Sequence, residues 1–338
     1  MKMGVLSGLK PEKVFYYFEE LCKIPHGSYH TKQISDYLVQ FAKERNLECS
    51  QDDSNNVVIR KAASAGYEDA PVVILQGHCD MVCEKTADST HDFEKDGLDL
   101  MIEGDYVTAN GTTLGGDDGI AVAYALAILD DDTLKHPALE VVITTDEEVG
   151  SGACHMDLER FGAPYAYTVD GGPEGEIQFE NFNAASAEFA IHGVNVHPGE
   201  AKDIMVNSMK IAMELQGMLP EQEAPEHTEG YEGFFHLMEM NGSVEETTMS
   251  YLIREFDAEK YEARKALMQE ITAKINAKYG EGTVELKLED SYRNMREMIE
   301  PCMQLIDFAV QACKDADVEP DIAPIRGGTD GARLSFVG

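Results

Sequence analysis

The sequence predicts an α/β protein in which a ferredoxin-like α+β small domain interrupts a larger domain built on a mostly parallel sheet. Over the first 180 residues, helical apolar patterns alternate with short apolar runs of the kind found in buried strands. From about residue 183 the order of expected elements becomes βαββαβ, which is the ferredoxin-like unit. We therefore expect one domain made of residues 1–182 and 296–338, and an inserted domain made of residues 183–295.

The larger domain is predicted from strands that are continuously apolar and from helices that carry one apolar stripe. The expected strands are residues 72–75, 139–143 and 165–169. Two helices carry apolar residues with the spacing i, i+4, i+7, i+8. Their apolar residues are Ile34, Leu38, Phe41 and Ala42 in the first, and Ile120, Tyr124, Ala127 and Ile128 in the second. A further helix is expected over residues 301–316.

The inserted domain is predicted from its own order of strands and helices. The expected elements are a strand at 185–191, a helix at 203–217, strands at 234–240 and 247–256, a helix at 258–278 and a strand at 284–288. The last strand alternates apolar and polar residues, as a half-buried strand does. An acidic stretch, residues 220–233, is a connection within this domain.

Composition excludes several classes of partner. The chain has 338 residues, enough for two domains, and its 27 Lys and Arg against 63 Asp and Glu give a formal charge of −36. Such a charge repels phosphate backbones and anionic lipid, so neither a nucleic acid nor a membrane is an expected partner. Seven cysteines without a framework, and no apolar leader, indicate a reducing cytoplasm. We expect Cys79 and Cys83 to pack rather than to bind metal.

Four acidic segments lie at or after predicted strands, where sheets of this class bind ligands. His78 and Asp80 come first, two residues apart, so that on a strand their side chains share a face. The other segments are residues 115–119, 145–148 and 168–172. Imidazole and carboxylate groups suit zinc, manganese or cobalt, and carboxylates can bridge two ions. The combination predicts a metal site.

Each of these residues also has an ordinary structural explanation when taken alone. His78 is compatible with a buried histidine of the core, and Asp117 with the N-cap of the helix that follows. Glu147 and Glu148 are compatible with a solvated loop, and Asp170 with a turn before two glycines. Four such segments in one sheet favour the metal site over four unrelated explanations.

The adjacent residues Glu147 and Glu148 suggest a division of labour. One carboxylate can bind metal while its neighbour takes a proton from water, which is an arrangement found in hydrolases. Repulsion by the other carboxylates should raise the proton affinity of the one that binds no metal.

These motifs resemble the co-catalytic zinc exopeptidases of the aminoacylase, carboxypeptidase G and peptidase T group. The shared motifs are residues 78–80, 116–119, 146–150 and 169–171. Up to about residue 140 the chain looks most like the aminoacyl-histidine dipeptidase branch, at residues 24–30, 77–82 and 111–115. From about residue 146 it looks like peptidase T, the tripeptide aminopeptidase, at residues 167–172, 179–185, 195–199, 228–234 and 326–332.

The resemblance implies a zinc exopeptidase-like catalytic domain with two zinc ions per subunit, for which cobalt or manganese can substitute. In this pattern Asp117 bridges both ions, His78 and Asp170 complete one site, and Glu148 belongs to the other. Asp80 does not bind an ion itself but orients the His78 ring.

The resemblance also implies catalytic and substrate-binding residues. Glu147 is the general base that activates the attacking water and then protonates the leaving amine. His197, in the small domain, reaches the active site of the partner subunit, which implies a homodimer formed through that domain. The residues expected to hold the peptide carboxylate are Asn207, Arg254, Gly327, Gly328 and Thr329.

One feature departs from the family. Its second metal site takes a further histidine after the segment that corresponds to residues 326–331, whereas the last histidine here is His236. We therefore expect a chain truncated at its carboxyl end, without the final strand and helix of the large domain.

The sequence and the resemblance together predict a dinuclear metallopeptidase that releases the amino-terminal residue of tripeptides. Tripeptides are favoured because the expected substrate contacts lie in the half that resembles peptidase T. Two alternatives stay open at this point. One is a dipeptidase of the aminoacyl-histidine type, and the other is an inactive metal-binding fragment.

Overall fold

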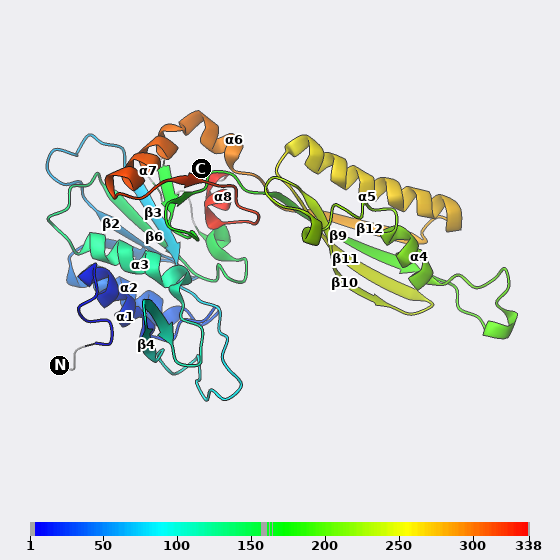
Figure 1. Cartoon of the computed structure of the whole chain (residues 1–338), viewed down its shortest axis with the longest axis horizontal. Coiled ribbons are helices and arrows are strands. Elements are labelled where there is room, and N and C mark those ends of the chain that lie inside the picture. The colour runs from blue at the N-terminus through cyan, green and yellow to red at the C-terminus, as the bar shows by residue number, and fades with distance from the viewer. Residues whose placement is uncertain (1–3, 157–160, 162, 164, 337–338) are drawn as a thin grey trace. The chain divides into compact units, whose positions relative to one another are not determined.

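The computed structural model describes residues 4–156, 161, 163 and 165–336. The chain forms two compact units, one of Met1–Glu174 with Arg333–Gly338 and one of Gly175–Ala332 (Figure 1). The second unit contains the whole predicted inserted domain together with residues 175–182 and 296–332. The predicted boundaries at 182/183 and 295/296 stay predictions.

The first unit is built on a five-stranded sheet with the order β1-β2-β6-β3-β7. Its strands are β1 (Glu48–Gln51), β2 (Val57–Lys61), β3 (Val73–His78), β6 (Leu139–Thr144) and β7 (Tyr165–Thr168). β3 runs parallel to both β6 and β7, whereas β2 is antiparallel to β1 and to β6. The α/β class is confirmed, and the sheet is mixed because of the antiparallel β1 and β2.

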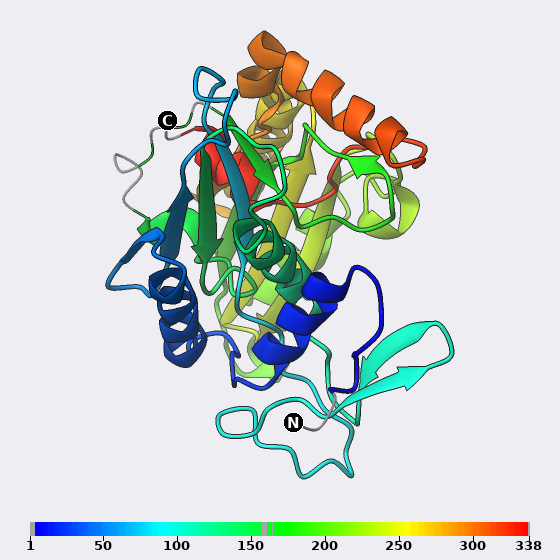
Figure 2. The ribbon, with the colours of Figure 1, turned by 90° about the vertical axis from the view of Figure 1, so that its left-hand side faces the viewer.

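Three helices cover one face of this sheet: α1 (Glu12–Cys22), α2 (Lys32–Glu44) and α3 (Gly116–Leu129) (Figure 2). Their apolar stripes meet alternate residues of β2 and β6 in one core. Members with no exposed surface include Leu38, Ile59, Leu126 and Val141. Burying each such side chain contributes roughly 1.5–3 kcal/mol. This core fixes the strands whose ends carry the acidic segments.

The other face of the sheet carries a smaller cluster. The residues between those of the main core, Val58 and Val142 among them, pack there with Met156 and Phe161. This alternation follows from the period of two along a strand. A separate hairpin is formed by β4 (Leu100–Glu103) and β5 (Tyr106–Ala109), joined at Gly104 with a φ of 63°.

The second unit has the βαββαβ order expected from the sequence. Its elements are β9 (Asn183–His192), α4 (Ser208–Gln216), β10 (Phe234–Gly242), β11 (Glu246–Glu255), α5 (Ala258–Tyr279) and β12 (Val284–Tyr292). The antiparallel sheet has the order β10-β11-β9-β12, so β11 and β9 form its central pair. Alternate residues of β9, such as Phe189 and Ile191, are buried with α4 and α5.

The remaining described elements are short except α7, which has 12 residues. They are η1 (Gly152–His155), β8 (Glu176–Ile177), η3 (Pro198–Glu200), η4 (Pro225–His227), α6 (Arg296–Ile299), η5 (Glu300–Cys302), α7 (Gln304–Asp315), β13 (Asp321–Ile322) and α8 (Asp330–Ser335). The helix expected at 301–316 is thus a 3-10 turn followed by α7. Among the described residues, no helix combines the length and the apolarity that crossing a bilayer requires.

Candidate metal centre

Three parallel neighbours, β6, β3 and β7, bring their carboxyl ends to one edge of the sheet. His78 is the last residue of β3, Glu147 and Glu148 follow β6, and Asp170 follows β7. The expectation of four strand ends in one sheet is wrong for the fourth segment, because Asp117 follows no described strand of this sheet and lies at the start of α3, which packs on β3. Strand order therefore gathers residues that are up to 92 positions apart in the sequence.

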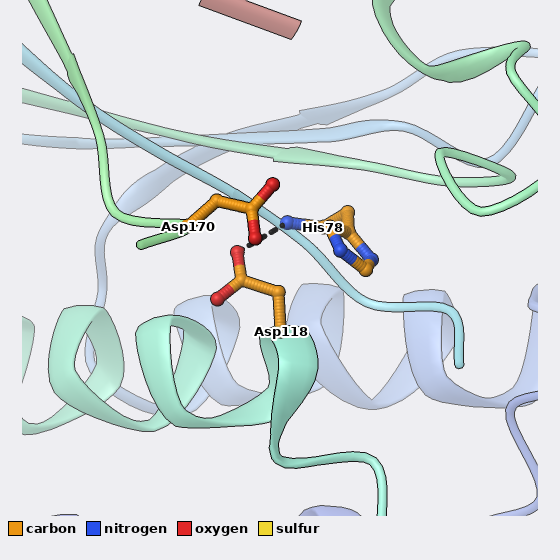
Figure 3. A group of neighbouring side chains, drawn as sticks. All are labelled: His78, Asp118 and Asp170. Atoms are coloured by element: carbon orange, nitrogen blue, oxygen red, sulfur yellow. Dashed lines mark hydrogen bonds between the residues drawn. The ribbon is translucent and has the colours of Figure 1, made fainter. Parts of the chain in front are cut away.

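Two overlapping groups of side chains could hold a metal ion. The first is His78, Asp117 and Glu148, and the second is His78, Asp118 and Asp170 (Figure 3). Within each group the ligand atoms all lie within 4.8 Å of one another. A buried imidazole surrounded by carboxylate oxygens suits a divalent ion, so the residues fit the expected metal.

His78 is held so that one ring nitrogen faces the carboxylates. Its Nδ1 donates to the backbone carbonyl of Asp80 at 3.0 Å, and Nε2 lies 3.0 Å from Oδ1 of Asp117. Burial alone would lower the pKa of His78, but hydrogen bonds to Asp117 and Asp80 and the charge of Asp118 raise it to about 11. The surroundings therefore favour positive charge at Nε2, where either a proton or a metal ion can supply it.

Asp80 connects this histidine to the acidic loop after β6. Its side chain is fully buried and accepts hydrogen bonds from Ser28 Oγ at 2.8 Å, from the Glu147 amide at 3.1 Å and from the Glu148 amide at 3.3 Å. Burial raises the pKa of Asp80, but its hydrogen bonds with His78 and Ser28 outweigh that effect and lower it. An ionised Asp80 thus positions both the imidazole and the backbone of the two glutamates.

Asp118 is a functional candidate that reasoning from the sequence missed. The Asp117–Asp118 peptide bond is cis, and both residues have non-helical backbone angles before the regular helix begins. Asp118 is buried, and its Oδ2 accepts a hydrogen bond from the His78 amide at 3.1 Å (Figure 3). Burial, and then the charge of Asp170, raise the pKa of Asp118 to about 8. The signal in the sequence was the pair of adjacent aspartates, of which only Asp117 was selected.

Asp117 and Glu148 are more accessible than Asp118. Asp117 is exposed and does not cap the helix, since Gly115 occupies the N-cap position. A hydrogen bond from His78 lowers the pKa of Asp117, which also hydrogen-bonds with Asp170. Burial and the charge of Asp117 raise the pKa of Glu148. Glu147 belongs to neither group of possible ligands among the described residues.

The expected substrate-binding residues lie in the second unit, each with a local role. Asn207 is the N-cap of α4 and accepts from the amides of residues 209 and 210, whereas the His197 ring accepts from the Gly199 amide. The guanidinium of Arg254 lies 5.4 Å from the ring centre of Tyr292.

The glycine segment of the second unit packs against the same aromatic ring. A Cβ on Gly328 would lie 2.8 Å from Cε1 of Tyr292, so a side chain there would displace the ring, whereas one on Gly327 would touch only Ile325 at 4.0 Å. Thr329 Oγ1 accepts from the Gly331 amide. Arg254 and Gly328 therefore share Tyr292 as a neighbour.

Comparison with known proteins gives three results. Residues 179–283 match the family described as peptidase dimerisation domain. Peptidase T of Clostridium novyi is 52% identical over 237 residues, which are 69% of this chain and 58% of that protein, so the match spans less than two thirds of this relative's length. Peptidase T of Geobacillus kaustophilus is 41% identical over 334 residues, which are 90% of this chain and 81% of the relative.

A solved structure gives the corresponding result for the fold. The crystal structure of an aminopeptidase from Bacillus cereus superimposes with a TM-score of 0.81 at 22% identity, covering 96% of this chain and 87% of that one. The likeness extends over both units, and the identity to the Geobacillus protein extends over nearly the whole chain. The chain belongs to the peptidase T family.

Proposed function

We propose that this chain is a metal-dependent exopeptidase of the cytoplasm that releases the amino-terminal residue of short peptides, tripeptides above all. The observation that carries the proposal is the buried His78 shared by two groups of carboxylates, with Asp80 tying it to Glu147 and Glu148. A free amino terminus is cationic, and the carboxylates around His78 attract it.

Zinc in the first place, with cobalt or manganese as substitutes, suits these imidazole and carboxylate donors. Asp117 contacts both His78 and Asp170, so it could serve two ions. His78 and Asp170 would complete one site, and Glu148 would belong to the other, which then has only Asp117 and Glu148 as ligands among the described residues. Bound ions of this kind polarise a peptide carbonyl and lower the pKa of water.

The chain's own residues supply the proton transfers and hold the ligands. Glu147, whose backbone Asp80 holds in place, takes a proton from the attacking water and passes it to the leaving amine. Asp80 also keeps a proton on Nδ1 of His78, so that Nε2 has a lone pair for the metal.

The second unit contributes substrate binding in this proposal. Arg254, assisted by Asn207 and the backbone of residues 327–329, holds the carboxylate of the peptide. The match of residues 179–283 to a dimerisation domain supports pairing through this unit. Pairing would place His197 at the partner's active site.

A dipeptidase of the aminoacyl-histidine type is the second candidate, because residues that resemble that branch build part of the centre. Ser28 donates to Asp80, and the Tyr29 amide donates to Oδ1 of Asp146 at 2.6 Å. Substrate preference can therefore depend on this segment as well as on the second unit.

The test is hydrolysis of Leu-Gly-Gly, its N-acetyl form and β-alanyl-histidine in excess zinc or cobalt. We expect cleavage of the free tripeptide alone. We expect Glu147→Gln to lower kcat by about 100-fold or more with zinc affinity unchanged. Glu103→Gln, an exposed glutamate on β4, is the matched control. Preference for the dipeptide would move the assignment to the second candidate, and no cleavage by the unmodified chain would make it an inactive metal-binding fragment.

A further inference from the structure

An apolar pocket of about 340 Å³ adjoins the candidate metal centre within the first unit. It lies between α1, the β4–β5 hairpin and the start of α3. The apolar side chains that form its wall are Phe15, Phe18, Val107, Leu114 and Ile120. The charged residues that line it are two candidate metal ligands, Asp117 and Asp170.

The position and the volume of this pocket suit part of a substrate. Small-molecule sites in proteins are about 300–1,000 Å³ and mostly apolar, with a few polar groups that fix orientation. A volume of about 340 Å³ is at the lower end of that range, which suits a single side chain rather than a whole peptide. Because Asp117 and Asp170 line it, a group bound there lies beside the centre.

Two glycines form part of the pocket wall next to the candidate ligands. Gly116 and Gly171 both line the pocket, and each adjoins a candidate ligand in the sequence. A Cβ on Gly171 would meet nothing within 4 Å, and one on Gly116 would meet only Leu114 at 3.8 Å. Packing thus leaves room for side chains at both positions, and their absence leaves space beside Asp117 and Asp170.

Charge indicates which side chain of a peptide reaches the pocket. The α-amino group of a free peptide is cationic and is drawn to the carboxylates that line the pocket, Asp117 and Asp170. The first side chain is attached to the same carbon as that amino group. We propose, on the basis of the proposed function, that this pocket binds an apolar side chain of the substrate's amino-terminal residue and selects for it.

A second pocket of about 210 Å³ on α3 and β3 is not the better candidate. Its wall includes Tyr124, Ile128 and Val169 but none of the possible metal ligands. A side chain bound there would have no described contact with the centre.

Val107→Phe tests the proposal, because the ring would fill the pocket from β5. Ile102→Phe is the matched control, since Ile102 pairs with Val107 in the same hairpin, is exposed and does not line the pocket. Substrates are Leu-Gly-Gly, Ala-Gly-Gly and Gly-Leu-Gly, with circular dichroism to verify folding. We expect Val107→Phe to lower kcat/KM for Leu-Gly-Gly by about tenfold or more and to leave Ala-Gly-Gly within about twofold.

Equal effects on all three substrates, no effect on any, or a selective loss of Gly-Leu-Gly would each overturn the proposal. If Val107→Phe does not fold, Phe15→Leu enlarges the pocket instead. It should raise kcat/KM for Trp-Gly-Gly relative to Leu-Gly-Gly by about threefold. An unchanged ratio would contradict the pocket.

Binding of L-leucinamide and L-alaninamide to the zinc-loaded protein separates this inference from the proposed function. Calorimetry should show that Val107→Phe weakens leucinamide binding by about fivefold or more and alaninamide binding little. Selective weakening in a protein that hydrolyses no peptide overturns the enzyme assignment and supports the pocket. Hydrolysis without any selectivity for the first residue overturns the pocket alone.

Discussion

Replacement of Asp80 by Asn tests how the centre is held together. The substitution keeps the shape of the side chain, removes its charge and replaces one carboxylate oxygen with an NH₂ group. In the structure Oδ1 accepts from the Glu147 amide, and Oδ2 accepts from Ser28 Oγ and the Glu148 amide. Whichever way the new amide is turned, its NH₂ group faces at least one backbone N–H, so at least one hydrogen bond is lost.

The expected loss of zinc affinity follows from the number of hydrogen bonds lost. A hydrogen bond to a charged group contributes about 1.5–3 kcal/mol, and at least one is lost. If this free energy is lost entirely from metal binding, the affinity for zinc falls by roughly 10- to 150-fold, since about 1.4 kcal/mol corresponds to tenfold. Loss of a partner behind a histidine ligand typically costs about 10- to 100-fold in metal affinity or activity, which agrees. We therefore expect Asp80→Asn to weaken zinc binding by about 10- to 100-fold.

Competition with a chromophoric chelator measures this affinity without any substrate. Asp132→Asn is the control, because that carboxylate is 98% exposed and the change in charge is the same. Thermal unfolding of the metal-free proteins verifies that the Asp80→Asn variant folds before zinc is added. Zinc binding by a folded Asp80→Asn protein within about twofold of the parent would refute the role given to Asp80.

Two further substitutions test neighbouring parts of the first unit. Ser28→Ala removes the 2.8 Å hydrogen bond to Asp80 and should lower kcat/KM for Leu-Gly-Gly by about three- to tenfold. Recovery in Ser28→Thr identifies the hydroxyl as the cause, whereas unchanged kinetics in Ser28→Ala would exclude a positioning role. Asp130→Asn removes a 2.6 Å ion pair with Arg45 and should lower the free energy of unfolding at pH 7 by about 1–2 kcal/mol. Burial raises the pKa of Asp130, but hydrogen bonds with Tyr17 and Arg45 outweigh it and hold the pKa below 3.8. The stabilisation is therefore complete above pH 3.8 and is lost as the pH falls through the lower folded pKa. Denaturant unfolding from about pH 7 to about pH 3 should show the two proteins converging, and a constant difference would contradict the ion pair.

Burial alone does not explain which strands could be predicted from the sequence, since β2 has three buried residues in a row and was missed, whereas β7 has none and was expected. β3 and β6 are short apolar runs, and alternate residues of β9 face the core, so their patterns follow directly from packing. β1 has the sequence Glu-Cys-Ser-Gln with no buried residue, and only its antiparallel pairing with β2 makes it a strand. No local pattern records that pairing, which is why the sheet was expected to be mostly parallel and is mixed.

The candidate ligands also differ in whether the sequence could predict their positions. His78, Glu148 and Asp170 lie at or after strand ends, and strand order alone predicts that they meet. Asp118 was missed because the family resemblance selects Asp117 and no pattern in the sequence places Asp118 in the interior. The backbone at Asp117 and Asp118 is not helical, and it turns Asp118 into the interior against the His78 amide. A helical pattern carries no information about such a departure.

The loop between α1 and α2 makes contacts with the centre that the two family resemblances do not indicate. Ser28 reaches Asp80 across 52 positions, and Tyr29 reaches Asp146 across 117. These contacts join the half that resembles the dipeptidases to the acidic loop that begins the half resembling peptidase T. The two resemblances therefore belong to different parts of the sequence, but residues from both parts build one centre. Asp80 binds the amides of Glu147 and Glu148, and Asp80 is itself held by Ser28 and His78. Substrate preference must in consequence be measured on the whole chain, because a segment exchanged at residues 24–30 alters the same carboxylates that a change after β6 alters.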